Sequence, residues 1–122
     1  MKLFEWFKEK FKNAPANRVI EVFCGDDDFV LRWPRGSNET VLWSDVQRIV
    51  IRNTDSGPFD EDVFFCLETG EDTFVIPQGA DGMPELLERM QQFPGFNNEA
   101  LIDSMGCTDN KLFLCWERVP TT

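Results

Sequence analysis

The chain has 122 residues, with 22 acidic and 12 basic side chains, a formal net charge of -10 and no histidine. The length fits a single domain over residues 1–122, and the 12 Phe and 4 Trp residues supply enough aromatic surface for a core, which argues against a disordered acidic chain. The negative charge disfavours direct binding to nucleic acid and to anionic membranes, and the missing histidine removes the usual general base and metal ligand.

Residues 2–13 have the pattern of an amphipathic helix. Leu3, Phe4, Phe7 and Phe11 fall on one stripe at helical spacing, and the lysines lie on the other faces. We expect this helix to dock on the chain's own sheet, with binding to a partner groove or to an anionic membrane as the alternatives. The segment lacks the long apolar run of a signal peptide, and no stretch reaches membrane-spanning length. We therefore expect no membrane span and a cytoplasmic location.

The middle of the chain is rich in predicted strands. β-branched and aromatic runs alternate with short turns of Gly, Asp, Asn and Pro, as in an antiparallel meander. The predicted strands cover residues 18–24, 29–33, 39–43, 46–52, 63–67 and 73–76, and a last one covers residues 111–117.

Two helices are predicted between the last two of these strands. The first begins near residues 81–84, because Pro84 is tolerated in a first turn, and a cap at Asn97 or Asn98 begins the second. Gly106 is expected to end the second helix. The side chains predicted to face inward are Leu86, Leu87, Met90 and Phe93 in the first helix, and Leu101, Ile102 and Met105 in the second.

These elements predict an α+β fold. We expect a curved antiparallel sheet of about six or seven strands, with the N-terminal helix and the two C-terminal helices packed to one side. A meander followed by a late helix resembles the pleckstrin-homology-like split barrel, from which the final strand after the helices departs.

Two segments resemble a known group of sequences. Residues 76–90 and 93–108, with residues 43–46 upstream, are similar to small uncharacterised bacterial proteins that carry a PGF-(D/N)-NE helix junction, here residues 94–99 (PGFNNE). The resemblance carries over no catalytic residues. In size and acidity the chain is also similar to the immunity proteins of bacterial toxin systems, which implies a protein partner.

The acidic turns are the candidate binding site. Asp26, Asp27 and Asp28 occupy the first hairpin turn, and Asp60, Glu61 and Asp62 occupy the longest turn-rich stretch. Glu68, Glu71 and Asp72 surround a third turn, which shares a sheet edge with the first if the strands alternate in direction. Such a field of carboxylates can steer a basic partner and imitate phosphates. The alternative interpretation is that these are ordinary turn residues that keep the chain soluble.

The sequence contains no cofactor or metal motif. The four cysteines form no CxxC pair, and no histidine is present to complete a metal set or to activate a thiol. We therefore expect no cofactor and no catalytic residues, with Cys24, Cys66 and Cys115 buried and reduced and Cys107 in a turn after the second helix.

The leading hypothesis is a non-enzymatic acidic protein-binding domain, of the type of an immunity protein that occludes a basic toxin or nuclease. One alternative is a regulatory or scaffold module with a pleckstrin-homology-like sheet that binds peptides or a second copy of itself. A further alternative is a small enzyme that uses carboxylates.

Overall fold

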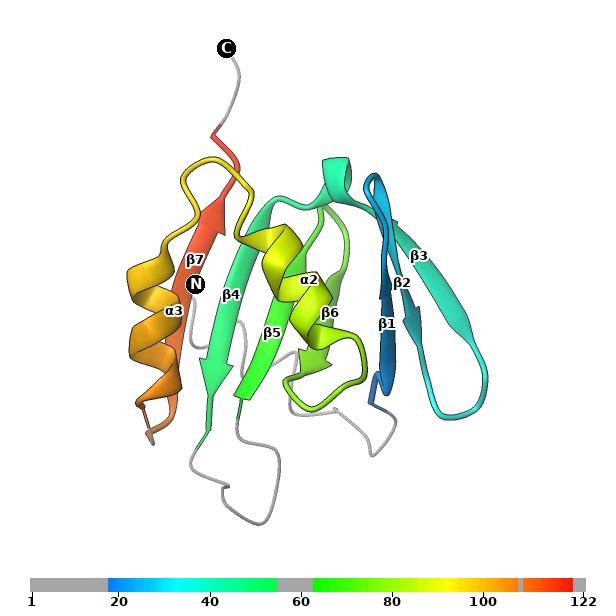
Figure 1. Cartoon of the computed structure of the whole chain (residues 1–122), viewed down its shortest axis with the longest axis horizontal. Helices are drawn as coiled ribbons and strands as arrows, with labels where there is room; N and C mark the ends of the chain where they lie inside the picture. Colours follow the sequence, from blue (N-terminus) through cyan, green and yellow to red (C-terminus); the bar gives the residue numbers. More distant parts are fainter. Residues whose placement is uncertain (1–17, 55–62, 108, 120–122) are drawn as a thin grey trace.

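The computed structural model describes residues 18–54, 63–107 and 109–119. Within these ranges, seven antiparallel strands form two sheets, and two helices lie between the sixth and seventh strands in the chain (Figure 1). The predicted α+β class is confirmed. The helix predicted for residues 2–13 lies outside the described residues.

The first sheet has three strands in the order β1-β2-β3. They are β1 (Glu21–Cys24), β2 (Asp28–Arg32) and β3 (Asn38–Leu42). Alternate residues of β2 are buried, and Leu31 pairs with Val22 of β1 while Phe29 pairs with Val41 of β3. This period of two gives the sheet an apolar inner face and an outer face that meets water.

The second sheet has four strands in the order β6-β5-β4-β7. They are β4 (Arg48–Asn53), β5 (Val63–Glu68), β6 (Thr73–Pro77) and β7 (Lys111–Glu117). A β-bulge between β4 and β7 allows the consecutive residues Cys115 and Trp116 both to be buried in the main core. Residues 63–67 of β5 are all buried, so this sheet carries apolar side chains on both faces.

The prediction of one curved sheet is wrong, because the chain turns a corner after β3. A single 3-10 turn, η1 (Trp43–Asp45), connects β3 to β4. Trp43 and Val46 in this connection are buried in the core, which directs β4 away from β3 and toward β5 and β7. The described strands form no closed barrel, and the fold departs from the pleckstrin-homology-like arrangement also in its last strand, which follows the helices and pairs with β4.

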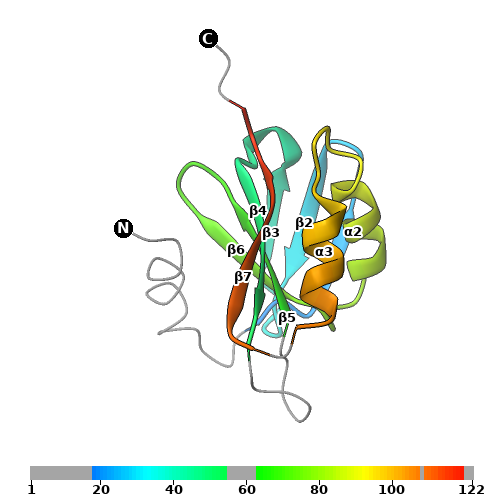
Figure 2. The same cartoon turned by 90° about the vertical axis from the view of Figure 1, so that its left-hand side faces the viewer.

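The helices α2 (Met83–Met90) and α3 (Asn98–Met105) both cover one face of the four-stranded sheet (Figure 2). In α2, Pro84 lies in the first turn as predicted, and Leu86 and Met90 are fully buried. Just before α2, Asp81 bridges Glu21 of β1, which fastens the helix to the first sheet. No helix in the described ranges has the length and apolar character needed to cross a membrane.

The predicted inward face of α3 is partly wrong. Leu101 is buried, but Ile102 is 68% exposed and Met105 is 45% exposed. Ser104 is fully buried instead, and its carbonyl accepts a hydrogen bond from the side chain of Asn53 on β4. The helix is therefore rotated so that a small polar residue, rather than a large apolar one, meets the sheet.

The core consists of two clusters on opposite faces of the four-stranded sheet. The larger cluster lies between the two sheets and the helices, and includes the stacked rings of Phe93 and Trp116, whose centroids are 4.6 Å apart. The smaller cluster lies on the face opposite the helices. We call it the outer-face cluster, and its members are Val50, Phe64, Cys66, Val75 and Leu112.

Candidate functional site

The first and third acidic turns lie at the same end of the molecule (Figure 1). Both are hydrogen-bonded to the connection between β3 and β4. The Trp43 N–H donates to the Asp27 carbonyl at 3.0 Å, and the Gln47 N–H donates to the Glu68 carbonyl at 2.7 Å. The two turns therefore flank one connection. The prediction that they share a sheet edge is wrong, because the first belongs to the three-stranded sheet and the third to the four-stranded sheet.

The β1–β2 turn presents two of the three predicted aspartates to solvent. Asp26 and Asp27 are exposed, whereas Asp28 is half-buried at the start of β2, where its carbonyl accepts a bond from the Gly25 N–H at 2.8 Å. Asp26 and Asp27 border a shallow hollow that Arg89 also lines. The predicted residues Asp60, Glu61 and Asp62 lie outside the described residues.

Two arginines offset the charge of this hollow. Arg89 donates to the Asp26 carbonyl at 3.3 Å, and its guanidinium lies 5.2 Å from the Trp43 ring and 5.1 Å from the Phe93 ring. Arg118 lines the same hollow and donates to the Val46 carbonyl at 2.9 Å. The predicted Asp26–Asp28 site is thus a mixed-charge surface rather than a purely acidic one.

A purely acidic surface lies on the other side of the connection. Here four carboxylates border a cleft of about 450 Å³, which we call the acidic cleft. They are contributed by β3, η1 and the β5–β6 turn, and are Glu39, Asp45, Glu71 and Asp72. Neither Lys nor Arg occurs among the described residues that line it; the other lining residues are Thr40, Val41, Gln47, Thr69, Gly70 and Phe74.

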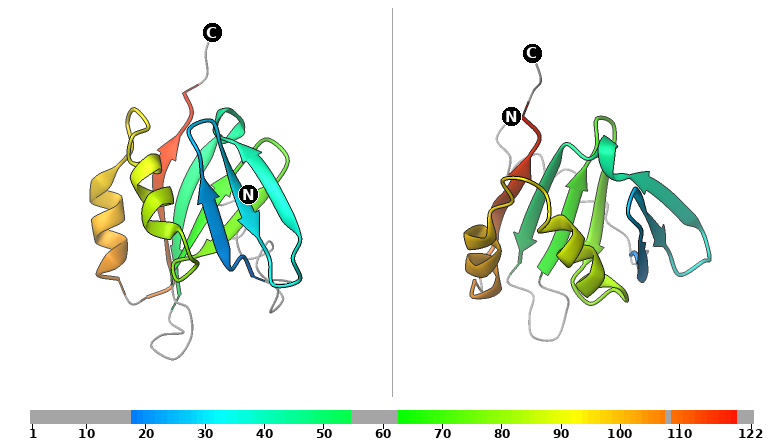
Figure 3. Two further views of the ribbon diagram at one scale, coloured as in Figure 1. Left: turned by 45° about the vertical axis from the view of Figure 1, so that its right-hand side comes forward. Right: turned by 45° about the horizontal axis from the view of Figure 1, so that its top comes forward.

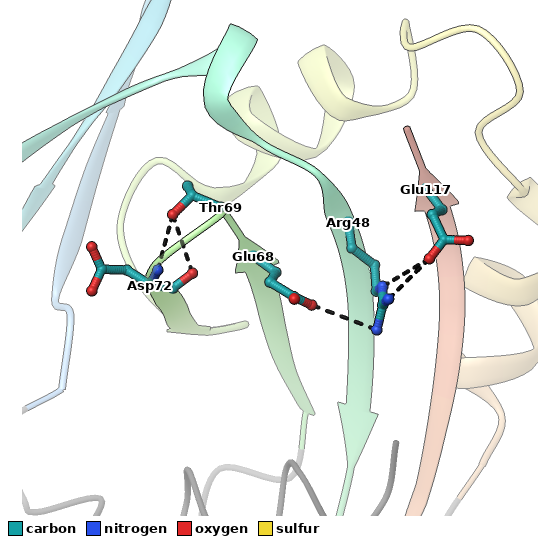
Figure 4. Close-up of polar contacts among 5 residues, drawn as sticks. All are labelled: Arg48, Glu68, Thr69, Asp72 and Glu117. Carbon is teal, nitrogen blue, oxygen red and sulfur yellow. Dashed lines mark hydrogen bonds and ion pairs between the residues drawn. The ribbon is translucent and has the colours of Figure 1, made fainter. Parts of the chain in front are cut away.

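The β5–β6 turn is held in shape by Thr69. Its hydroxyl accepts a hydrogen bond from the Asp72 N–H at 3.1 Å and donates to the Asp72 carbonyl at 3.3 Å (Figure 4). The Thr69 N–H also donates to the same carbonyl, at 2.8 Å. Glu71 and Asp72 are both exposed, so this rigid turn holds two hydrated carboxylates at one side of the cleft.

The opposite side of the cleft is the free edge of β3, on the part of the first sheet that lies away from both helices (Figure 3). The Trp43 N–H bond to Asp27 sets the pairing with β2, so Val41 and Glu39 share their backbone hydrogen bonds with β2. The alternate residues Asn38, Thr40 and Leu42 therefore turn their N–H and C=O groups outward. No strand in the described part of the chain pairs with this edge.

The nearby arginine on β4 does not neutralise the cleft, because two other carboxylates bind it. Arg48 contacts Glu117 through two nitrogens, each 3.0 Å from the same oxygen, and lies 3.6 Å from an oxygen of Glu68 (Figure 4). These three side chains form a ladder across β5, β4 and β7. The carboxylates of the acidic cleft therefore keep their net negative charge.

Glu39 and Asp45 were not among the predicted site residues. Glu39 pairs with the buried Leu31 and so lies on the core side of β3. A charged residue at such a position of an edge strand indicates that this end of the core side is in contact with water. That alternation of charge and apolar residue was visible in the sequence. The approach of Glu39 to Asp72 was not, because it depends on how the two sheets are placed.

The thiols are poorly suited to nucleophilic chemistry. Cys66 and Cys115 are buried, and burial raises the pKa of both thiols, that of Cys115 to about 11. Burial also raises the pKa of the half-buried Cys24 thiol. In the described ranges, no three His, Cys, Asp or Glu side chains gather in a way that could hold a metal ion.

No protein-family model matches the chain, and no curated protein or solved structure is significantly similar to it. The acidic cleft itself offers carboxylates together with the hydroxyls of Thr40 and Thr69. These groups accept hydrogen bonds from ammonium and guanidinium groups. The chemistry of the cleft therefore suits lysine and arginine side chains.

Proposed function

We propose that this chain is a non-enzymatic, acidic protein-binding domain whose acidic cleft receives basic side chains of a partner protein. The observation that carries the proposal is the lining of the cleft, where Glu39, Asp45, Glu71 and Asp72 lie together without a described lysine or arginine beside them. The net charge of -10 adds a long-range attraction for the same class of partner.

The cleft is suited to fast and selective association more than to high affinity by charge alone. A solvent-exposed ion pair contributes only about 0–1 kcal/mol, because water and salt screen it. A field of like charges, however, steers the encounter and can raise the association rate to about 10⁸–10⁹ M⁻¹s⁻¹ at low salt. The apolar side chain of Phe74, which lines the cleft, would supply part of the remaining affinity.

An immunity-type inhibitor is the form of this function that we favour. A toxin or nuclease that acts on nucleic acid has a basic substrate cleft, and an acidic domain can occlude it by imitating phosphates. Asp26 and Asp27 lie at the same end of the molecule and extend the contact surface beyond the cleft. Asp28, Asp60, Glu61 and Asp62 remain predicted contacts.

A second candidate function is a regulatory or scaffold module, which the free edge of β3 favours. The outward N–H and C=O groups of Asn38, Thr40 and Leu42 could pair with an extended peptide or with a second copy of the chain. This contact would depend on backbone hydrogen bonds, so it would persist at high salt, whereas charge steering would weaken.

Substitutions that replace carboxylates with amides test the acidic cleft. The cleft variant carries E39Q, D45N, E71Q and D72N, and its matched control carries E85Q, E88Q, D103N and D109N at exposed positions elsewhere. Four carboxylates are removed in each, so both variants have a net charge of -6 instead of -10. With a decalysine peptide as the probe, we expect the cleft variant to bind more weakly and more slowly than the control.

The same pair of variants tests the partner class in a lysate of the source organism. We expect the unmodified chain and the control to capture a basic protein at low salt, and the cleft variant to lose it. Equal binding by both variants, of the peptide and of the captured protein, would rule out the acidic cleft as the binding site. Loss of binding in T40P, which removes an outward N–H, with the cleft variant unaffected, would favour edge pairing instead.

A further inference from the structure

The outer-face cluster on the four-stranded sheet is buried, although both helices lie on the opposite face (Figure 2). Only 1% of Val50, 5% of Phe64 and 1% of Cys66 is exposed. Val75 and Leu112 pack beside them and are partly buried. Because the strands that carry these side chains lie in one sheet, they cannot cover one another completely.

The outer face of the three-stranded sheet shows what an uncovered face looks like in the same molecule. Phe23 alternates with the buried Val22 and is 50% exposed, and Leu42 alternates with the buried Val41 and is 46% exposed. Val50, Phe64 and Cys66 are thus about ten times less exposed than Phe23 and Leu42, whereas Leu114, on the β7 side of the same face, is 43% exposed. Another part of the chain must therefore cover the outer-face cluster.

The position of Arg18 indicates which part that is. Arg18 is the first described residue, and its guanidinium carbon lies 5.1 Å from the centre of the Phe64 ring, in a cation–π contact. The chain therefore reaches residue 18 at the outer-face cluster. The 17 residues before it start from that point and carry the Leu3, Phe4, Phe7 and Phe11 stripe.

The dimensions agree with this placement. A helix over residues 2–13 is about 18 Å long, and a four-stranded sheet is about 14 Å wide between its outer strands. Residues 14–17 can span about 13 Å when extended, which lets the helix reach any part of the sheet from Arg18.

We propose that residues 2–13 form an amphipathic helix that docks its Phe4, Phe7 and Phe11 stripe on the outer-face cluster and so covers this face of the four-stranded sheet. The proposal is independent of the acidic cleft, which lies between the connection after β3 and the β5–β6 turn.

Cys66 reports on the cover without an added probe. It belongs to the outer-face cluster, whereas Cys115 belongs to the main core on the helical side of the same sheet. Burial raises the pKa of the Cys66 thiol, so the covered thiol is slow to react with N-ethylmaleimide. Labelling followed by peptide mass spectrometry reads the two cysteines separately, and Cys115 reports whether the fold is intact.

The test compares two double variants of the full chain. F4Q/F7Q removes two rings from the stripe, and E9Q/K12Q changes two residues on the opposite face of the helix while both variants keep the net charge of -10. We expect F4Q/F7Q to raise the labelling rate of Cys66 by about tenfold or more with Cys115 still protected, and E9Q/K12Q to change neither. An unchanged Cys66 rate in F4Q/F7Q would overturn the proposal.

A measurement on the unmodified chain covers the case in which F4Q/F7Q unfolds and both cysteines react. We expect nuclear Overhauser effects between the ring protons of residues 4, 7 and 11 and the methyl protons of Val50, Val75 and Leu112. Their absence would overturn the proposal. A dimer would also overturn it. If dilution dissociates a dimer in sedimentation and exposes Cys66 to labelling at the same time, a second copy of the chain covers the cluster.

Discussion

Gly82 lies where the start of α2 meets β1, and we expect its replacement by alanine to lower the free energy of unfolding. Its φ of +88° lies in the left-handed region, where a Cβ costs about 1 kcal/mol. An added Cβ would also lie 2.1 Å from the Val22 carbonyl oxygen, a backbone atom that cannot rotate away. The backbone must therefore shift by about 1 Å to relieve the contact.

That shift disturbs the bridge between β1 and the residue before Gly82. The Val22 N–H donates to the Asp81 carbonyl at 2.7 Å, and the Asp81 N–H donates to the Ile20 carbonyl at 3.0 Å. Each bond contributes about 1 kcal/mol net. We therefore expect G82A to lower the free energy of unfolding by about 3 kcal/mol, measured by urea denaturation with tryptophan fluorescence.

Substitutions at two other glycines distinguish the strain of a positive φ from the steric contact with β1. Gly36 has a φ of +84° with no atom near its added Cβ, so G36A should cost only the conformational strain of about 1 kcal/mol. Gly70 has neither a positive φ nor a close neighbour, so G70A should be close to neutral. If G82A and G36A destabilise the protein equally, the close approach of Gly82 to β1 does not matter and the reasoning fails.

Three further substitutions follow from single contacts. N97A removes the side-chain cap of α3, which accepts an N–H bond at 3.0 Å, and should cost about 1 kcal/mol in urea denaturation, whereas N98A should cost less than half as much. N53A removes the amide that donates to the carbonyls of Ser104 and Cys107 at 2.5 and 2.9 Å, and should cost about 2 kcal/mol although the Ser104 carbonyl keeps its bond from the Cys107 N–H; a loss under about 0.5 kcal/mol would contradict this bond assignment. Burial raises the pKa of Cys115 from 9.0 to about 11, so between these values the folded chain holds a proton that the unfolded chain has released, and stability falls as pH rises. C115A should reduce that slope by about 1.4 kcal/mol per pH unit, and an identical slope in both proteins would show that the thiol does not contribute.

The acidic cleft shows that exposed carboxylates could be predicted from the sequence, whereas the set of carboxylates that lie together could not. The sequence indicated exposed carboxylates in the turns at residues 26–28 and 69–72, because Gly and Asp favour turns and charged groups stay in water. The first of these turns lies beside Arg89, which sequence spacing could not place there. The second lies across a cleft from Glu39, a residue about 30 positions earlier in the chain. Charge density along the chain therefore predicted an acidic surface without predicting which carboxylates share it.

Local chemistry was sufficient to determine most of the elements. The strands follow alternating β-branched and aromatic residues, and α2 begins where Pro84 is tolerated, as the sequence predicted. Asn97, one of the two predicted caps, begins α3. Each of these features depends on residues within one turn or one strand. Local backbone preferences and short hydrogen bonds are therefore enough to indicate these elements from the sequence.

The tertiary structure decided which strands pair and which helix face is buried. The corner at Trp43 separates β3 from β4, and the ring of Trp43 at this corner is buried against core residues distant in sequence, such as Phe93. Ser104, rather than Ile102, faces the sheet, where its carbonyl accepts from Asn53 and its buried hydroxyl donates to the Leu101 carbonyl. These outcomes depend on the burial of residues distant in sequence. The composition and the residue pattern therefore predict an acidic α+β domain, while its packing creates the acidic cleft.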